Sequence, residues 1–214
     1  MNPTAYDAWY ATPRGQWVGE TELALLWQLL EPIGAGSVLD VGCGTGWFTR
    51  QLAVRLPGRV LGVDLDPTML AYARSQPGNT PYAVADAQAL PFPDAGMDAV
   101  VSITALCFVQ DWRQALEEMV RVARRRIVLG LLNRHSLLYL QKGLRGGSGA
   151  YRGAHWHTHR EVLQALAGLP VTRIQTRTAI FLPEGTTAAR WLEARLPTRL
   201  PVGSFLAVAA DVRK

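Results

Sequence analysis

Short apolar runs alternate with longer amphipathic stretches along most of the chain. The runs have the length of β-strands and cover residues 38–41, 59–64, 81–85, 99–103, 127–132, 171–180 and 203–210. Continuous apolar runs of this kind are typical of strands that are buried on both faces of a sheet. The pattern therefore predicts an α/β protein in which strands and helices follow one another in turn.

Apolar residues at helical spacing predict the helices between these runs. The predicted helices cover residues 20–30, 47–56, 67–74, 112–123, 159–167 and 187–196, with a further one between 133 and 144. Pro32 and Gly34 provide the stop signal for the first of them. Because no repeat or linker interrupts the pattern, we expect a single domain over residues 1–214. We expect an N-terminal arm at 1–34 and a substrate-side insertion at 133–160.

Three alternate glycines, Gly42, Gly44 and Gly46, follow the first apolar run and precede a predicted helix. Glycine permits positive φ and lets a ligand approach the backbone, and the free N–H groups of a helix start attract negative charge. The G-x-G-x-G spacing departs from the G-x-G-x-x-G fingerprint of dinucleotide sites. Asp40, two residues before the first glycine, suits a ligand that carries an ammonium or sulfonium better than it suits a pyrophosphate.

The glycine segment, Leu-Asp-Val-Gly-Cys-Gly-Thr-Gly at 39–46, resembles the first motif of class I S-adenosylmethionine (SAM) dependent methyltransferases. Residues 90–98, Leu-Pro-Phe-Pro-Asp-Ala-Gly-Met-Asp, resemble the family's Leu-Pro-Phe-x-Asp-x-x-Phe-Asp segment, with Met97 where an aromatic residue is usual. The resemblance implies a doubly wound, mostly parallel seven-stranded sheet of the Rossmann-like type with helices on both faces. The last strand would lie antiparallel between the fifth and sixth. It also implies SAM as cofactor and S-adenosyl-L-homocysteine as product.

Acidic residues follow the second and third predicted strands. Asp64 lies about 20 residues beyond the glycines, where a doubly wound sheet places a carboxylate on ribose hydroxyls. Asp66, followed by Pro67, has the pattern of a helix N-cap, so we assign ribose binding to Asp64 and capping to Asp66. The resemblance implies that Asp86 accepts a hydrogen bond from adenine and that the Ala87 amide reads the ring edge, although Asp86 also fits a turn. The implied cofactor contacts are Asp40, Gly42, Cys43, Gly44, Gly46, Asp64, Leu65, Asp86, Ala87 and Thr104.

Aromatic residues crowd the N-terminal arm. By resemblance, such an arm covers the cofactor and substrate and excludes water; the alternative is that its aromatic rings simply bury area against the sheet edge. Four glycines between positions 146 and 153 predict a mobile flap in the insertion. The candidates for substrate or lid contacts are Tyr6, Trp9, Tyr10, Arg14, Trp17, Tyr151 and Trp156.

Three histidines alternate at His155, His157 and His159. Alternate histidines of a strand can chelate a metal. However, Thr158 and Glu161 form a capping-box pattern, and a helix that starts there breaks the strand geometry. We therefore expect no metal. His155 or His157 remains a weak candidate for a substrate-facing base, and the motifs themselves identify no catalytic residue.

Composition and charge add few constraints. The 214 residues are 49% hydrophobic and 18% charged, as in an ordinary globular protein. No apolar run reaches the roughly 18 residues of a membrane span, and the first residues lack a secretion signal, so we expect a cytoplasmic protein without membrane insertion. The two cysteines form no metal-ligand pattern. The net charge of +5 permits an anionic partner, and we assign Arg124–Arg126 to the end of a helix, where cations complement the helix dipole.

The preferred hypothesis is a methyltransferase that acts on a small molecule, resembling those of ubiquinone and menaquinone biosynthesis. Arg14, Lys142, Arg145 and Arg152 are compatible with an acidic acceptor. A methyltransferase acting on RNA or protein, a non-catalytic SAM-binding protein and a nicotinamide-dependent dehydrogenase are the alternatives. The absence of an Asn/Asp-Pro-Pro-Tyr tetrapeptide and of an appended binding module disfavours nucleic acid. The sequence does not indicate an oligomeric state or which acceptor atom is methylated.

Overall fold

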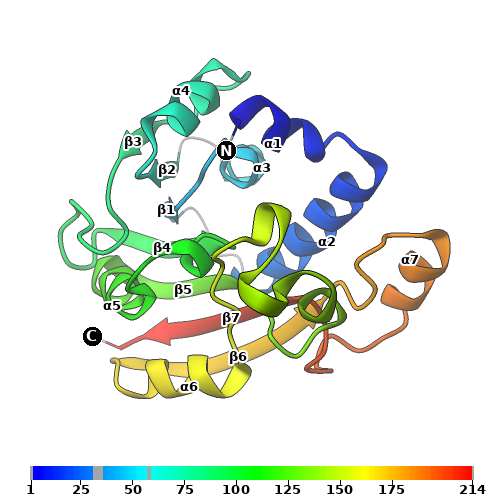
Figure 1. Ribbon diagram of the computed structural model, residues 1–214. Helices are drawn as coiled ribbons and strands as arrows, with labels where there is room; N and C mark the ends of the chain where they lie inside the picture. Colours follow the sequence, from blue (N-terminus) through cyan, green and yellow to red (C-terminus); the bar gives the residue numbers. More distant parts are fainter. Residues whose placement is uncertain (1, 31–35, 57–58, 214) are drawn as a thin grey trace.

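The computed structural model describes residues 2–30, 36–56 and 59–213 (Figure 1). Its seven strands are β1 (Val38–Val41), β2 (Val60–Asp64), β3 (Tyr82–Val84), β4 (Met97–Ile103), β5 (Ala123–Leu132), β6 (Val171–Ala179) and β7 (Phe205–Val212). They form one sheet in the order β3-β2-β1-β4-β5-β7-β6. Strands β1 to β5 pair in parallel, and β7 runs antiparallel between β5 and β6. The predicted doubly wound sheet and the placement of its last strand are confirmed.

The α-helices are α1 (Pro3–Trp9), α2 (Pro13–Leu30), α3 (Trp47–Arg55), α4 (Pro67–Ser75), α5 (Trp112–Val122), α6 (His159–Ala167) and α7 (Thr187–Glu193). Helix α2 starts at Pro13, one and a half to two turns before the predicted start, because proline fits the first helical turn. The predicted stop at Pro32 and Gly34 lies outside the described residues.

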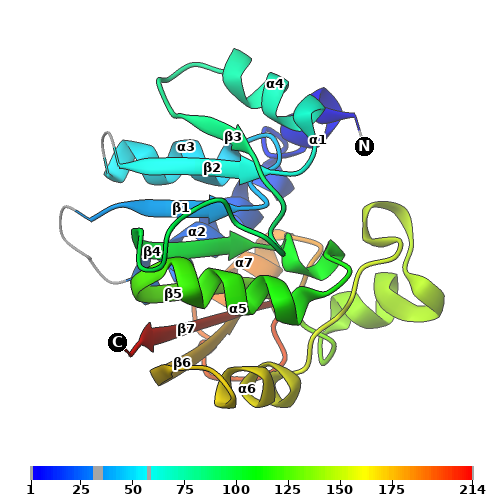
Figure 2. The same cartoon turned by 90° about the vertical axis from the view of Figure 1, so that its left-hand side faces the viewer.

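Two apolar clusters pack on the two faces of the sheet. Alternate strand residues point to opposite faces, so Leu39 and Val41 of β1 join the cluster with α5, whereas Val38 joins the cluster with α2 and α3. Figure 2 shows α5 on one side of the sheet and α2 and α3 on the other. In the same view the parallel strands end toward α1 and the loops of the insertion. Ligands of doubly wound sheets bind at this carboxyl-end edge.

The helix predicted between residues 133 and 144 is present in shorter form, over residues 137–143, and most of it has π rather than α geometry. After Asn133 the chain forms a π turn (η2, Tyr139–Gly143) and two 3₁₀ turns (η3, Leu144–Gly146; η4, Gly149–Tyr151). A further 3₁₀ turn, η1 (Leu106–Phe108), follows β4. Arg145 adopts a positive φ of 56°, which no α-helix accommodates, and Gly146 and Gly147 follow with positive φ. The apolar spacing therefore predicted a helix, and the positive φ values beginning at Arg145 lie just beyond its predicted end.

The arginine run was also assigned to the wrong element. Residues Arg124–Arg126 lie in β5, not at a helix end, because α5 ends at Val122. Arg124 forms an ion pair with Asp98 at 3.0 Å and the buried Arg126 pairs with Asp211 at 3.5 Å. These cations are neutralised by neighbouring strands rather than by a helix dipole.

Candidate functional site

The glycine turn between β1 and α3 has the backbone conformation that only glycine adopts readily. Gly42, Gly44 and Gly46 have φ values of 74°, 55° and 75°. Gly46 is the N-cap of α3 and contributes no side-chain acceptor to the helix. The first N–H groups of α3 are therefore available to a ligand at this edge of the sheet.

The end of β4 packs closely against Gly42. Thr104 has a positive φ of 55°, which is unusual for a β-branched residue, and its N–H donates to the Gly130 carbonyl at 2.7 Å. This turn brings Ala105 so near that a Cβ on Gly42 would collide with the Cβ of Ala105. A Cβ on Gly44, by contrast, would meet no protein atom within 4 Å. Gly42 is therefore required for packing, whereas the space beside Gly44 is open to a ligand.

Asp64 ends β2 and Asp66 follows it. The predicted N-cap role of Asp66 is confirmed. Asp66 is the N-cap of α4, and its side chain accepts from the Thr68 N–H at 2.8 Å. The Asp64 carboxylate accepts from the Gly44 N–H at 2.7 Å through one oxygen and from the Asp66 N–H at 2.9 Å through the other. A carboxylate offers about four acceptor positions, so two of them remain for the hydroxyls of a ribose. Asp64 thus fits the sugar of SAM while it also supports the glycine turn.

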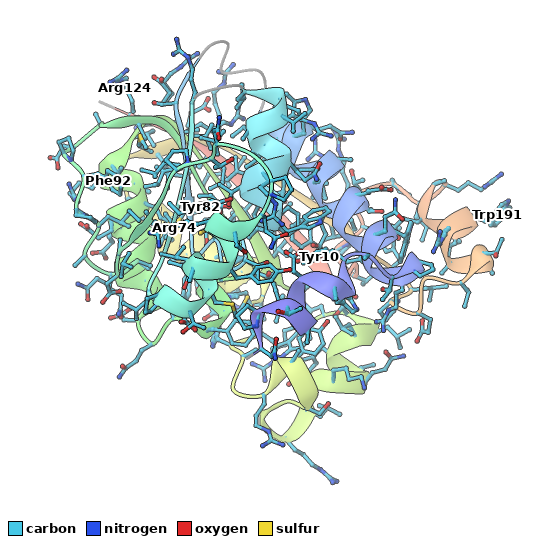
Figure 3. The ribbon with its side chains drawn as sticks, turned by 90° about the horizontal axis from the view of Figure 1, so that it is seen from above. Tyr10, Arg74, Tyr82, Phe92, Arg124 and Trp191 are labelled. Carbon is cyan, nitrogen blue, oxygen red and sulfur yellow. The ribbon has the colours of Figure 1, made fainter. Side chains whose placement is uncertain are left out.

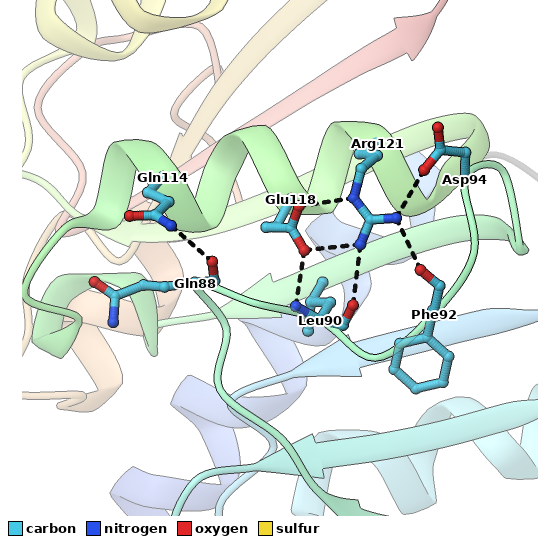
Figure 4. Close-up of polar contacts among 7 residues, drawn as sticks. All are labelled: Gln88, Leu90, Phe92, Asp94, Gln114, Glu118 and Arg121. Carbon is cyan, nitrogen blue, oxygen red and sulfur yellow. Dashed lines mark hydrogen bonds and ion pairs between the residues drawn. The ribbon is translucent and has the colours of Figure 1, made fainter.

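Asp86 lies in a tight turn after β3. Its side chain accepts from the Gln88 N–H at 2.9 Å, which confirms the turn-forming interpretation and leaves the adenine contact a prediction. Figure 4 shows how the following segment is fixed to α5. The Arg121 guanidinium donates to the Leu90 and Phe92 carbonyls and pairs with Glu118 and Asp94.

The Glu118–Arg121 ion pair satisfies the whole backbone of Leu90. Glu118 accepts from the Leu90 N–H at 2.8 Å, and Arg121 donates to the Leu90 carbonyl. The network holds Asp86 and Ala87 at the carboxyl end of β3, beside Asp64.

Asp40 is almost fully buried beneath the glycine turn and is 2% exposed. The Thr49 hydroxyl donates to it at 2.7 Å. Burial raises the pKa of Asp40 to about 7, and the nearby Asp64 carboxylate adds to the effect. A ligand ammonium in the cavity beside Asp40 would favour its charged form. The contact between Asp40 and the cofactor stays a prediction.

The arm lies over the glycine turn. A small cavity of about 30 Å³ is lined by Tyr6 and Tyr10 from the arm and by the residues of the turn, Asp40, Gly42, Cys43, Gly44 and Thr45 among them. Such a volume holds about one water molecule. The Tyr10 ring stacks on Trp47 of α3 with centroids 4.4 Å apart and an interplanar angle of 12°. Figure 3 shows Tyr10 near the middle of the molecule and Trp191 at its periphery.

Polar contacts also hold α1 in this position. Asp7 pairs with Arg50 of α3 at 3.1 Å and accepts from the Tyr72 hydroxyl of α4 at 3.4 Å. Helix α1 therefore bridges the two helices that follow the cofactor-side strands β1 and β2. The cavity below it is smaller than SAM, so movement of α1 on cofactor binding is a prediction.

Other predicted lid residues lie elsewhere. Trp17 packs toward Gly185 and under the Arg190 guanidinium, whose carbon is 5.8 Å from the ring centroid, so it does not cover the turn. Arg14 donates to the Pro183 carbonyl at 2.6 Å. Trp156 is 5% exposed and contacts the Tyr151 ring at 5.5 Å, which makes it part of the insertion's core rather than a free substrate contact. Leu65 is exposed at the mouth of the site, and Trp9 meets the edge of Tyr10.

The three alternate histidines differ in burial and in their hydrogen-bond partners. His157 is fully buried, and burial lowers its pKa to about 3, so its ring is neutral and shielded from solvent. His155 is partly exposed, with its Nε2 2.9 Å from a Glu161 oxygen. His159 bonds to the Thr176 hydroxyl at 3.0 Å. The candidate role of His157 as a substrate-facing base is incorrect because no solvent reaches its ring.

Glu22 of α2 is an ionisable residue that the sequence analysis missed. It shares a helix face with the buried Val18 and Leu26, four residues away on either side, and this position was the available signal. Burial raises the pKa of Glu22 to about 8. Its charge acts on the ionisation of Tyr6 in α1 and of Tyr151 in the insertion.

The raised pKa values predict the pH dependence of stability. Unfolding returns Glu22 to an ordinary pKa, so the unfolded state loses its proton first and stability falls as pH rises from about 4.5 to 8. We expect Glu22→Gln to raise the free energy of unfolding by about 3 kcal/mol at pH 8 and to leave it nearly unchanged at pH 4. Urea denaturation at both pH values measures this. The exposed Glu20→Gln is the control, and an equal effect at both pH values would contradict the assignment.

The comparisons with known proteins agree with this geometry. Residues 39–129 match a family model described as a methyltransferase domain. Residues 39–129 therefore have the sequence of a methyltransferase domain. SAM is the cofactor that such a domain uses, and its contacts with the glycine turn, Asp64 and Asp40 stay predictions.

Two curated relatives match beyond this segment. The malonyl-[acyl-carrier protein] O-methyltransferase of Serratia marcescens is 34% identical over 155 residues, covering 72% of this chain and 56% of that protein. An uncharacterised protein of Mycobacterium bovis is 34% identical over 186 residues, covering 85% of this chain and 62% of that protein. The methyltransferase chain thus spans about three fifths of the length of these relatives.

A solved structure supports the fold of the methyltransferase domain. A SAM-dependent methyltransferase from Thermotoga maritima aligns with a TM-score of 0.75 at 21% identity, covering 98% of this chain and 95% of that one. Within the described part of the chain, no helix has the length and apolar character that a membrane span requires.

Proposed function

We propose that the protein transfers the methyl group of SAM to a small-molecule acceptor. The observation that carries the proposal is the arm: Tyr6 and Tyr10 cover the glycine turn and leave a cavity of about 30 Å³. A site closed by its own chain suits an acceptor that enters whole, whereas a polymer requires an open groove. The S. marcescens relative bears the name of an O-methyltransferase for a malonyl group on a carrier protein.

The chain contributes positioning and water exclusion to this reaction. SAM, when bound, supplies an already activated methyl group, so the transfer needs donor and nucleophile in line. Asp64 holds the sugar side, and Asp40 lies beneath the glycine turn toward the cavity. The aromatic rings of the arm keep water from the reacting atoms.

The charge of the insertion favours an acidic acceptor. Residues 133–160 contain no aspartate or glutamate and five cations, which are Arg134, Lys142, Arg145, Arg152 and Arg160. All five are exposed. The loops of the insertion lie toward the edge of the sheet where the parallel strands end (Figure 2). These cations increase the local concentration of an anionic acceptor near the site.

A labelled-methyl assay tests the class of acceptor. The purified protein is incubated with SAM carrying a labelled methyl group and a cell extract, and the products are separated by size. We expect the label in the small-molecule fraction. Label in protein or RNA would contradict the small-molecule proposal and support the alternative acceptors, and no label in any fraction would support a non-catalytic SAM-binding protein.

The lid role of the arm makes a separate prediction. Because we expect α1 to move to admit SAM and then close on it, SAM should slow amide hydrogen exchange in residues 3–10 as well as in the glycine turn. Exchange measured by mass spectrometry with and without S-adenosyl-L-homocysteine checks this. Protection confined to residues 42–46 and 64–66 would show that the arm does not close over the cofactor.

A further inference from the structure

A cluster of three metal-ligating side chains lies in the insertion and the start of α6, away from the glycine turn. Taking one ligand atom each from His155, His157 and Glu161, all the atoms lie within 4.8 Å of one another. His155 Nε2 is 2.9 Å from a Glu161 carboxylate oxygen. The His155 and His157 rings meet edge to face at 4.5 Å. The fold thus gathers two imidazoles and a carboxylate at one point.

His157 is the unusual member of this cluster. Its side chain is 0% exposed, and neither Nδ1 nor Nε2 has a hydrogen-bond partner. A buried polar group left without a partner costs about 1–3 kcal/mol, and proteins normally satisfy it with another group, a water or an ion. The ring is fixed in place: its backbone N–H donates to Leu132 at 2.8 Å, and it packs edge to face on Trp112 at 4.7 Å. A ligand at its nitrogen would remove this cost.

Glu161 is positioned by the capping box of α6. Thr158 accepts from the Glu161 N–H at 3.1 Å, and one Glu161 oxygen accepts from the Thr158 N–H at 3.4 Å. The other oxygen points toward His155. The sequence argument against a metal assigned Glu161 to the capping box alone and did not consider it as a ligand. The start of α6 removes His159 from the possible metal ligands. The first turn of the same helix places the Glu161 carboxylate beside His155.

We propose that His155, His157 and Glu161 bind a divalent transition-metal ion, with Zn²⁺ the best match. Two imidazole nitrogens and one carboxylate oxygen form a ligand set that zinc accepts at about 2.0–2.2 Å, with a fourth position for water or another ligand. The fourth position can face solvent because the His155 side chain is 44% exposed. His155 and Glu161 can move closer to a bound ion, since both side chains are partly exposed, while His157 stays fixed.

The site would join two parts of the fold. The backbone N–H groups of His155 and His157 donate to the carbonyls of Cys107 and Leu132, after β4 and at the end of β5. An ion would therefore tie α6 to the carboxyl-end edge of the sheet. The nearest competing charge is Arg113, whose guanidinium stacks 4.8 Å from the Trp112 ring centroid and acts on His157. The negative charge of Glu161 opposes it.

Calorimetric titration of Zn²⁺ into the reduced full chain tests the proposal. We expect one site, and we expect His155→Ala and Glu161→Gln each to weaken binding by roughly tenfold or more, because even outer-shell changes cost 10–100-fold. Glutamine can still form the capping box, so Glu161→Gln separates metal binding from helix capping. His157 is left unchanged because its removal would open a gap in the core.

The exposed His135 provides the matched control. His135→Ala should bind Zn²⁺ as the unmodified chain does. Zinc bound equally by the His155 and Glu161 variants would place it at other groups and overturn the proposal. An unmodified chain that binds no zinc would do the same, and would leave the His155–Glu161 contact as a simple hydrogen bond.

Discussion

Replacing Asp64 by alanine is expected to abolish measurable SAM binding while the chain stays folded. Asp64 ends β2 and has two acceptor positions left after its bonds to the Gly44 and Asp66 N–H groups. Hydrogen bonds to a charged group contribute about 1.5–3 kcal/mol each, so the loss of two bonds to ribose corresponds to roughly a 100-fold or greater loss of affinity. Isothermal titration with SAM measures this loss.

Asp66→Ala is the matched control for Asp64→Ala. Asp66 lies two residues away, carries the same carboxylate side chain and caps α4. Its removal should cost about 1 kcal/mol of stability, as loss of an N-cap does, and leave SAM affinity unchanged. If Asp66→Ala impaired binding and Asp64→Ala did not, the assignment of the two acids would be reversed.

The second large effect is expected at Gly44. Its φ of 55° makes an alanine there cost about 1–2 kcal/mol of stability, but no protein atom lies within 4 Å of the added Cβ. We expect SAM to occupy this space beside Gly44. Gly44→Ala should therefore fold and lose SAM affinity by roughly 100-fold, far beyond the effect of its strain. Thermal denaturation and titration with SAM measure the two effects separately.

Gly78→Ala controls for backbone strain alone. Gly78 also has a positive φ, at 116°, and open space around its Cβ position, but it lies in the loop after α4. It should lose some stability and keep its SAM affinity. Equal SAM affinity in the Gly44 and Gly78 variants would show that the ligand does not lie against Gly44.

Local sequence signals predicted the strands and the turn because each depends on neighbouring residues. Asp66 could be recognised as an N-cap since Pro67 follows it, and the glycines could be recognised from their spacing. The resemblance supplied the strand order, which no local pattern contains. Gly42 illustrates the limit: its contact with Ala105 joins residues far apart in the chain.

The residues that the sequence analysis missed or misplaced depend on tertiary contacts. Glu22 gains its raised pKa from burial, and Glu161 joins the histidines only when α6 starts at His159. The apolar spacing predicted the helix at 137–143 but not its π geometry. Trp156 was expected at the substrate and instead packs against Tyr139 of η2 and Tyr151 of η4.

Calorimetric titration of the unmodified protein with SAM, S-adenosyl-L-homocysteine and NAD tests the central claim most directly. We expect saturable heat with one site for SAM and for S-adenosyl-L-homocysteine, and none for NAD. No heat with either sulfur compound would contradict the central claim.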